Sequence, residues 1–400
     1  MQIRTYKSEK YLLLFTLLDI LIGPYTFFLA TTYSQFIIFF WFLYKDKRYF
    51  QKKEVSFYYG ILAFILLSVI ISLVVLPSHM LAKYAIENLK RGLAIGMAIS
   101  YYFFFYYMFK TYKIDLEKWL LTFVLFVTLW GILYYFNIGI FLTLKVLFNP
   151  FDATLSNLVN ENFLYRFNYI WTDPNNVGYA LVGVVAFLIL SKNTRNIVLI
   201  ICVLCLLFNL LIIMSAGSFI SAVLIIPLAI FIRIKNSGTV KNFIMILLSL
   251  FVIFYFINEY SSLLTNSEVG QESISRLDEK NETGDKRPDI WKELLQSKNI
   301  ILYTFAGEGV SLFVNGKHYS PHSGHFVFIF GFGLICYYFY MYLIFRKSKK
   351  QLWTDLIYIL PFFLCFTINI GIGELKFAAM LYMLVAYSRI KKNIKLAITE

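Results

Sequence analysis

Residues 197–214 read IVLIICVLCLLFNLLIIM and include no charged residue. A helix of this length can cross the hydrocarbon core of a bilayer, about 30 Å thick, while satisfying its own backbone hydrogen bonds. Similar apolar blocks recur along most of the 400-residue chain. Their length differs from the roughly ten-residue alternation of a membrane β-barrel. The sequence therefore predicts an all-α, polytopic integral membrane bundle.

The overall composition points the same way. The chain is 59% hydrophobic and 20% aromatic, and only 15% of its residues are charged, whereas soluble proteins have about 25% charged residues. A net charge of +14 would suit nucleic acid, but Lys and Arg gather in loops on one side of the apolar blocks. The positive-inside rule then places both termini in the cytoplasm, and we expect no nucleic-acid partner.

We expect about 12 transmembrane helices. The first two are short and joined by Gly23-Pro24, so they could equally form a kinked, partly re-entrant pair. Outer segments are expected at 77–91 and 143–176. The expected spans are residues 11–28, 31–44, 56–76, 92–109, 119–142, 177–190, 197–214, 219–232, 243–257, 326–345, 352–370 and 377–387.

One long polar segment interrupts this succession of helices. We expect an N-terminal transmembrane bundle over 1–257, which includes the outer loop 143–176. A large extracytoplasmic loop over 258–325 would lie between helices 9 and 10, followed by C-terminal helices and a cytoplasmic tail over 326–400. The large loop holds three of the four histidines, so any chemistry is expected there.

Within the large loop, residues 288–297 have a helical pattern. Four apolar residues are expected to share one face, on the bundle or the bilayer: Ile290, Trp291, Leu294 and Leu295. Trp291 would then lie at headgroup level, and Arg287, four residues earlier, would lie above the same face. A guanidinium there can bind a lipid diphosphate through two donors. The alternative is a solvated basic residue.

His322 and His325 lie where the chain re-enters the apolar region. A neutral imidazole, with an ordinary pKa of about 6.5, can accept a proton from a sugar hydroxyl. A hydrogen-bonded histidine at the membrane interface is the alternative. His318 would complete a zinc-like spacing, but Pro321 and Gly324 interrupt a regular helix through the three histidines. We expect no metal and no other cofactor.

The earlier outer loop contains Arg166 followed by a turn signal, Asp-Pro-Asn-Asn, at 173–176. Asn175 or Asn176 can cap the helix that follows. Elsewhere, Asp19 and Glu374 are the exceptions to a near absence of ionisable residues at mid-membrane depth. Ion-coupled carriers usually need such groups, so their scarcity argues against a transporter.

Four elements then occur in a characteristic order. Arg166 precedes Pro174-Asn175, Arg287 precedes Trp291 by four residues, Gly307 and Gly309 form Gly-x-Gly, and His322-Ser323 precedes Gly331 and Gly333. This order resembles the O-antigen ligase and polymerase (Wzy-type) family. One departure is Ser323, which occupies a position where Asn is frequent. Arg276 competes with Arg287 as the loop arginine, and the spacing to Trp291 favours Arg287.

The resemblance implies a GT-C-like membrane enzyme that uses a glycan on undecaprenyl diphosphate as donor and acceptor. The lipid tail would lie between helices while Arg166, Arg287 or Arg276 hold the diphosphate, with Asn175, His325 and Trp291 contributing to substrate binding. His322 would deprotonate the acceptor hydroxyl, which attacks the anomeric carbon with inversion and without metal. The expected location is the outer face of a bacterial cytoplasmic (inner) membrane.

The resemblance leaves several activities open. A polymerase of oligosaccharide repeat units for capsule, O-antigen (lipopolysaccharide) or exopolysaccharide is the first. A ligase that moves glycan to another acceptor shares the donor chemistry. Two alternatives belong to other classes of protein. They are a lipid-linked oligosaccharide flippase or other transporter, and a scaffold of the assembly machinery. Membrane lipids are expected partners, and a chain-length regulator and a flippase could be others.

Overall fold

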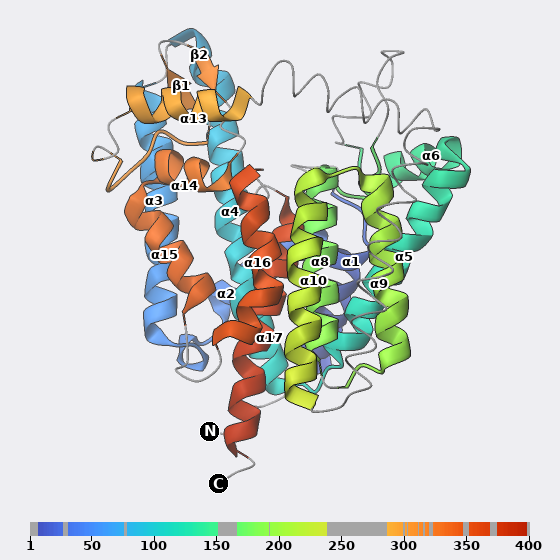
Figure 1. Ribbon diagram of the computed structural model, residues 1–400. Coiled ribbons are helices and arrows are strands. Elements are labelled where there is room, and N and C mark those ends of the chain that lie inside the picture. The colour runs from blue at the N-terminus through green and yellow to red at the C-terminus, as the bar shows by residue number, and fades with distance from the viewer. Residues whose placement is uncertain are drawn as a thin grey trace. The chain divides into compact units, whose positions relative to one another are not determined.

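The computed structural model describes residues 7–26, 31–75, 78–150, 166–191, 193–237, 286–298, 301, 303–310, 312–314, 317–319, 323–346, 352–368 and 374–397. Most of these residues are helical (Figure 1). A short antiparallel hairpin joins β1 (Leu312–Val314) to β2 (Lys317–Tyr319). The chain forms two compact units. Unit 1 comprises Met1–Ile114, Arg287–Leu352 and Phe366–Glu400, and unit 2 comprises Asp115–Lys286 and Trp353–Cys365.

Unit 1 is organised around α4, which packs against α17, α3 and α2. Every residue from 101 to 109 of α4 is buried, and most are Tyr or Phe. Such large rings supply much of the apolar area removed from solvent or lipid. The helices of unit 1 are α1 (Lys7–Leu21), α2 (Tyr33–Tyr44), η1 (Lys47–Tyr49), α3 (Lys52–Val75), α4 (Ser78–Thr111), α13 (Lys286–Ser297), α14 (Gly324–Phe332), α15 (Leu334–Phe345) and α17 (Leu375–Ala397).

Unit 2 is organised around α8, which is buried along nearly its whole length and packs against α5, α9 and α10. Small residues such as Gly178 and Gly183 let neighbouring helices approach it closely. The helices of unit 2 are α5 (Leu116–Phe136), α6 (Ile138–Phe148), α8 (Pro174–Leu190), α9 (Asn196–Ile213) and α10 (Ala216–Ser237), together with residues 353–365 of α16 (Leu352–Ile368).

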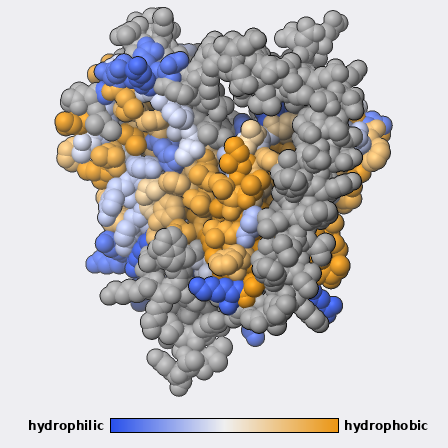
Figure 2. Space-filling model, in the orientation of Figure 1, coloured by the Kyte–Doolittle hydropathy of each residue, from blue (hydrophilic) through white to orange (hydrophobic). Residues whose placement is uncertain are grey.

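Five described helices are long and apolar enough to cross a membrane: α3, α4, α5, α9 and α10. Shorter apolar helices are α2, α6, α8, α15 and α16. Figure 2 shows hydrophobic residues over the middle of the visible face and hydrophilic residues nearer its upper and lower ends. These features support a helical membrane protein. The expected count of 12 spans is not confirmed, and the span expected at 243–257 lies outside the described residues.

Two expected spans are each divided into two helices. Asn137 ends α5 through its backbone N–H, and its side chain accepts from the N–H of Ile140 to start α6. Gly333 separates α14 from α15 with a φ of 98°, a backbone conformation that favours glycine. The span expected at 326–345 is therefore a nine-residue helix followed by a second helix.

The segment expected to lie outside the membrane at 77–91 is helical from Ser78, as the first part of the 34-residue α4. Its charged residues can be solvated on exposed turns. Arg91 Nη2 lies 2.5 Å from Glu87 Oε1, one helical turn away, and pairs at this spacing support a helix. The outer segment and the span expected at 92–109 therefore belong to one continuous helix.

Buried ion pairs tie the helices of unit 1 together. The carboxylate of Glu54, which is 2% exposed, lies 2.9 Å from Arg389 and 3.2 Å from Arg346. It also accepts a hydrogen bond from the hydroxyl of Tyr102 at 3.1 Å. This cluster joins α3, α4 and α17 to the residue that follows α15. Breaking such a buried pair leaves an uncompensated charge, which is strongly destabilising.

Candidate functional site

The residue expected to act as the base, His322, lies outside the described residues, and so does Arg276. Arg287 lies in the first turn of α13, and His318 lies in β2 opposite Phe313. Four sequence-predicted residues can be followed to their side chains: Trp291 and His325 in unit 1, and Arg166 and Asn175 in unit 2.

The helix predicted at 288–297 is confirmed as α13. Ile290 and Leu294 pack with Tyr303, Leu312 and Phe330 in a small core. The ring of Trp291 lies 5.6 Å from that of Phe326, between centroids. Leu295 is 51% exposed and lies outside this small core. One face of α13 is therefore seated on α14, and Figure 1 shows α13 and the β1–β2 hairpin near the same end of unit 1.

The Gly307–Glu308–Gly309 turn pairs with the end of α14. The N–H of Glu308 donates to the carbonyl of Phe330 at 3.0 Å, and the N–H of Gly309 donates to that of Gly331 at 2.9 Å. The N–H of Gly307 donates to Ser68 Oγ of α3 at 3.1 Å. Two sequence elements recognised separately, Gly-x-Gly and the glycines after His322-Ser323, thus lie side by side.

A buried ion pair holds this turn to the end of α13. Lys298 Nζ lies 2.6 Å from Glu308 Oε2 and donates to the hydroxyl of Tyr303 at 3.1 Å. That hydroxyl in turn donates to Glu308 Oε1. Burial, together with the adjacent Glu308 carboxylate, raises the pKa of Tyr303 above its ordinary value. No role was expected for these three residues, which lie within eleven positions of one another in the sequence.

His325 lies in the first turn of α14. Its Nδ1 is 3.0 Å from the hydroxyl of Tyr337 on α15, and its ring lies edge-on to Phe366 with centroids 6.1 Å apart. Ser323, which immediately precedes α14, is 2% exposed and donates to the carbonyl of Phe366 at 3.3 Å. The residue after His322 is therefore anchored to the C-terminal end of α16.

In unit 2, Arg166 is docked on the corner between α9 and α10. Its Nε donates to the carbonyl of Ile213 at 3.2 Å and its Nη2 to that of Met214 at 2.9 Å. Met214 ends α9 in the left-handed conformation, with a φ of 52°. A guanidinium is favoured at the negative end of a helix dipole, so this corner orients the arginine.

Asn175 reaches the same corner. Its Oδ1 accepts a hydrogen bond from Ser215 Oγ at 2.7 Å. The expectation that Asn175 or Asn176 caps α8 is wrong. Asp173 is the cap, because its side chain accepts from the N–H of Asn175 at 2.7 Å while Pro174 occupies the first turn. Its carboxylate is well placed at the positive end of the helix.

Lys145, expected in a loop, is fully buried on α6. Its ammonium donates to Asn168 Oδ1 at 2.6 Å, to the carbonyl of Tyr169 at 2.7 Å and to that of Trp171 at 2.5 Å. These bonds shape the segment that carries Arg166. The signal that could have revealed this helix is an apolar run bounded by Asn137 and Asn149, with one lysine inside it.

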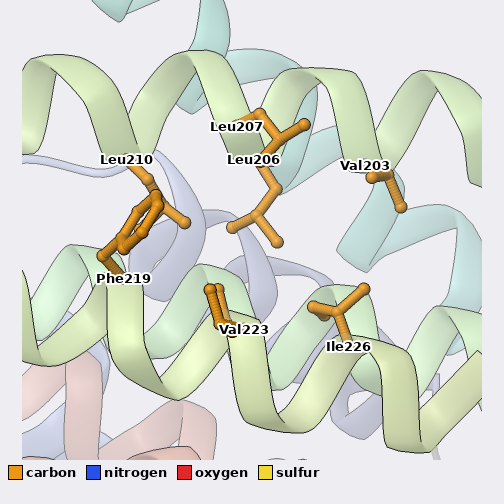
Figure 3. Close-up of a pocket in the computed structure, with 8 residues that line it drawn as sticks. Val203, Leu206, Leu207, Leu210, Phe219, Val223 and Ile226 are labelled. Carbon is orange, nitrogen blue, oxygen red and sulfur yellow. The ribbon is translucent and has the colours of Figure 1, made fainter. Parts of the chain in front are cut away.

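Sequence reasoning also missed Ser215. The signal for it was a cluster of small residues, Ser-Ala-Gly-Ser at 215–218, between two apolar runs. Beside this corner, α9 and α10 enclose a small groove whose lining is almost wholly apolar. Figure 3 shows Leu210 and Phe219 at one end of the groove and Val203 and Ile226 at the other.

A further polar cluster is buried in unit 1, between the first and last helices. Asp19 Oδ2 accepts from the N–H of Ser34 at 2.6 Å, at the start of α2. Lys376, which is fully buried, donates to the carbonyl of Gly23 and lies 4.8 Å from the centre of the Tyr25 ring. Lys376, which was not expected among the ionisable residues at membrane depth, is thus buried as Asp19 is.

No family model matches the chain, and neither a curated protein nor a solved structure matches it. In the parts of the chain that the structure describes, no group of three or more His, Cys, Asp or Glu side chains is arranged to hold a metal ion. The functional interpretation therefore depends on the residues of the chain itself.

Proposed function

We propose that this protein is a membrane glycosyltransferase that joins oligosaccharide repeat units carried on undecaprenyl diphosphate. It would act at the outer face of a bacterial cytoplasmic membrane, with both termini in the cytoplasm and about 12 spans. The products would be capsule, O-antigen or exopolysaccharide. The apolar helices support a membrane location, and the ordered elements from Arg166 to Gly333 support the activity.

The single observation that carries the proposal is the meeting of separately recognised elements in unit 1. The helix that begins with Lys286-Arg287 is seated through Trp291 on Phe326, in the helix that directly follows His322-Ser323. The Gly307–Gly309 turn pairs with the same helix at Gly331. The helix whose first turn holds Arg287 and the helix that follows His322-Ser323 thus pack against each other, which supports a shared role for the two sequence elements.

The chemistry needs few groups. His322 accepts the proton of an acceptor hydroxyl, and the resulting oxygen nucleophile attacks the anomeric carbon of the donor. The bond from that carbon to the diphosphate oxygen breaks, and the lipid diphosphate leaves with the electron pair. Arginines such as Arg166 and Arg287 stabilise the charge that develops on the leaving group. No metal is needed because the diphosphate is already an activated leaving group.

A cell-based test separates polymerase from ligase. Deletion of a polymerase leaves single repeat units on the lipid, whereas deletion of a ligase leaves long lipid-linked chains that are not transferred. We expect His322→Ala and Arg166→Ala strains to reproduce the single-unit profile while the variant proteins remain in the membrane at wild-type amounts. Normal polymer from both variants would contradict the assigned site.

A transporter of lipid-linked oligosaccharide is the second candidate, and one specific observation favours it. Asp19 and Lys376 are buried between the first and last helices of unit 1, and buried ionisable groups in membrane helices commonly serve transport. The transporter predicts that Asp19→Asn or Lys376→Met leaves repeat units on the cytoplasmic face. If the protein is a glycosyltransferase, any variant that loses function should instead leave unpolymerised units on the outer face.

A further inference from the structure

The corner between α9 and α10 lies at the end of two apolar helices of unit 2, and the binding role given to it below rests on the proposed function. Three consecutive residues there orient two side chains that the sequence singled out. The carbonyls of Ile213 and Met214 bind Arg166, and the hydroxyl of Ser215 binds Asn175. All five residues belong to unit 2. The corner therefore acts as one platform for a guanidinium and a carboxamide.

The hydroxyl of Ser215 determines which end of the Asn175 amide is engaged. Ser215 Oγ accepts a hydrogen bond from the N–H of Ser218 at 3.3 Å, in the first turn of α10. A hydroxyl has a single proton, and that proton is given to Asn175 Oδ1 at 2.7 Å. The planar amide then directs its Nδ2 donors away from Ser215.

Close packing of α8 on α10 brings Asn175 to Ser215. A Cβ atom placed on Gly178, one turn after Asn175, would lie 2.7 Å from the Cβ of Ser218. Real Cβ atoms do not approach this closely, so any larger residue at 178 would push the two helices apart. The glycine thus permits the 2.7 Å hydrogen bond between Asn175 and Ser215.

We propose that Ser215 is a positioning residue, which fixes the Asn175 amide so that its N–H donors meet a phosphate oxygen of the lipid diphosphate beside Arg166. A phosphate binds most tightly to donors that are already oriented, because less conformational freedom is then lost on binding. Ser215 does not touch the substrate. Ser215 affects phosphate binding only by orienting the Asn175 amide.

The test measures both binding and transfer with the purified full-length protein in lipid nanodiscs. The probe for binding is undecaprenyl diphosphate itself, and the probe for transfer is a lipid-linked repeat unit. We expect Ser215→Ala to weaken binding and to raise KM about tenfold, the equivalent of one well-oriented hydrogen bond, with kcat nearly unchanged. Ser215→Thr retains a hydroxyl and should restore binding to within about threefold.

Two further variants separate positioning from general stability. Ser221→Ala removes another buried hydroxyl of α10 and should leave binding unchanged. Adding Ser215→Ala to Asn175→Ala should cost nothing further, because the amide that Ser215 orients is already gone. Wild-type binding in Ser215→Ala, or additive losses in the double variant, would overturn the inference while leaving the glycosyltransferase intact.

Failure of the proposed function has a different signature. If the wild-type protein neither binds undecaprenyl diphosphate nor extends lipid-linked units, the glycosyltransferase proposal falls and the role of Ser215 falls with it. If the wild type binds, Ser215→Ala weakens binding and Ser215→Thr restores it, the positioning role stands whatever the transfer assay shows.

Discussion

The two units hold their candidate residues by different means. In unit 1, Lys298 is paired with the carboxylate of Glu308, and the Gly307–Gly309 turn is held by backbone hydrogen bonds to α14. In unit 2, the described acceptors of Lys145 and Arg166 are uncharged oxygens, mostly backbone carbonyls. A carboxylate cancels the charge of the cation it binds, whereas a carbonyl orients a cation without cancelling its charge.

The difference bears on how each segment is held. In unit 1 the ion pair between Lys298 and Glu308 joins the end of α13 to the glycine turn. In unit 2 the oxygens that accept from Lys145 and Arg166 hold the 166–171 segment to α6 and to the corner between α9 and α10. The predictions below test these two arrangements, from the largest expected effect to the smallest.

The largest effect is expected at Gly307. A Cβ atom there would overlap the backbone of Phe330 and Gly331, so Gly307→Val must separate the turn from α14. Overpacking of this kind costs about 3 kcal/mol. We expect a lower midpoint of thermal unfolding, measured on purified protein. Gly139→Ala is the matched control, since its new Cβ would approach only Asn137 Oδ1, at 3.6 Å. Equal midpoints for the two variants would show that the turn is not packed on α14.

The next effect is expected at Lys145. In Lys145→Met, three oxygen acceptors of the 168–171 segment lose their donor, at a cost of about 2 kcal/mol. Hydrogen exchange of residues 166–173 should become faster, and binding of undecaprenyl diphosphate should weaken because Arg166 is no longer oriented. Lys118→Met, at a side chain that is 81% exposed, serves as the control and should change neither. Unchanged exchange at 166–173 in Lys145→Met would contradict the structural role of the ammonium.

A smaller effect is expected for the ion pair of unit 1. Glu308→Gln leaves the ammonium of Lys298, whose side chain is 8% exposed, without its carboxylate, at a cost of about 1.5 kcal/mol. Adding Lys298→Met should recover part of that loss, because the unpaired buried charge is then gone. The unfolding free energies of the two single variants and the double variant measure this coupling. Strictly additive losses would mean that the pair contributes nothing as a pair.

The smallest effect is a dependence on alkaline pH. The pKa of Tyr303 is raised in the folded protein by burial and by Glu308, so the unfolded chain releases this proton at lower pH than the folded one does. The stabilisation is complete below the ordinary tyrosine pKa of about 10 and is lost as the pH rises above it. The unfolding midpoint should fall less steeply between about pH 9 and 11 in Tyr303→Phe than in wild type. Identical slopes would place Tyr303 in an ordinary aqueous environment.

The sequence predicted those helices that are determined by residues close together in the chain. The helix α13 could be predicted because its apolar spacing follows a proline and an acidic residue, features that act within one or two turns. The break at Asn137 was missed because apolar residues continue on both sides, so that a single capping side chain divides the run. The continuity of residues 78–91 with the span expected at 92–109 was also missed, because a helix can carry charged residues on its exposed turns and continue into an apolar span.

For the candidate site, the sequence predicted individual residues but little of the structure around them. The resemblance implied ligand binding by Arg166 and Asn175, but their shared corner depends on Met214 adopting the left-handed conformation. No local pattern predicts that conformation at a methionine. The burial of Lys145 likewise arises from a loop that folds back over α6. Such contacts join residues that are distant in sequence, so periodicity carries no information about them.

The most direct test of the central claim is an extension assay. Purified protein in lipid nanodiscs is given undecaprenyl-diphosphate-linked repeat units, with excess metal chelator and no nucleotide, and the lipid-linked products are separated by length. The proposed polymerase predicts a ladder of longer glycans together with free undecaprenyl diphosphate, and neither product with His322→Ala. Unextended donor with the wild-type protein under these conditions, or an equal ladder from His322→Ala, would contradict the account.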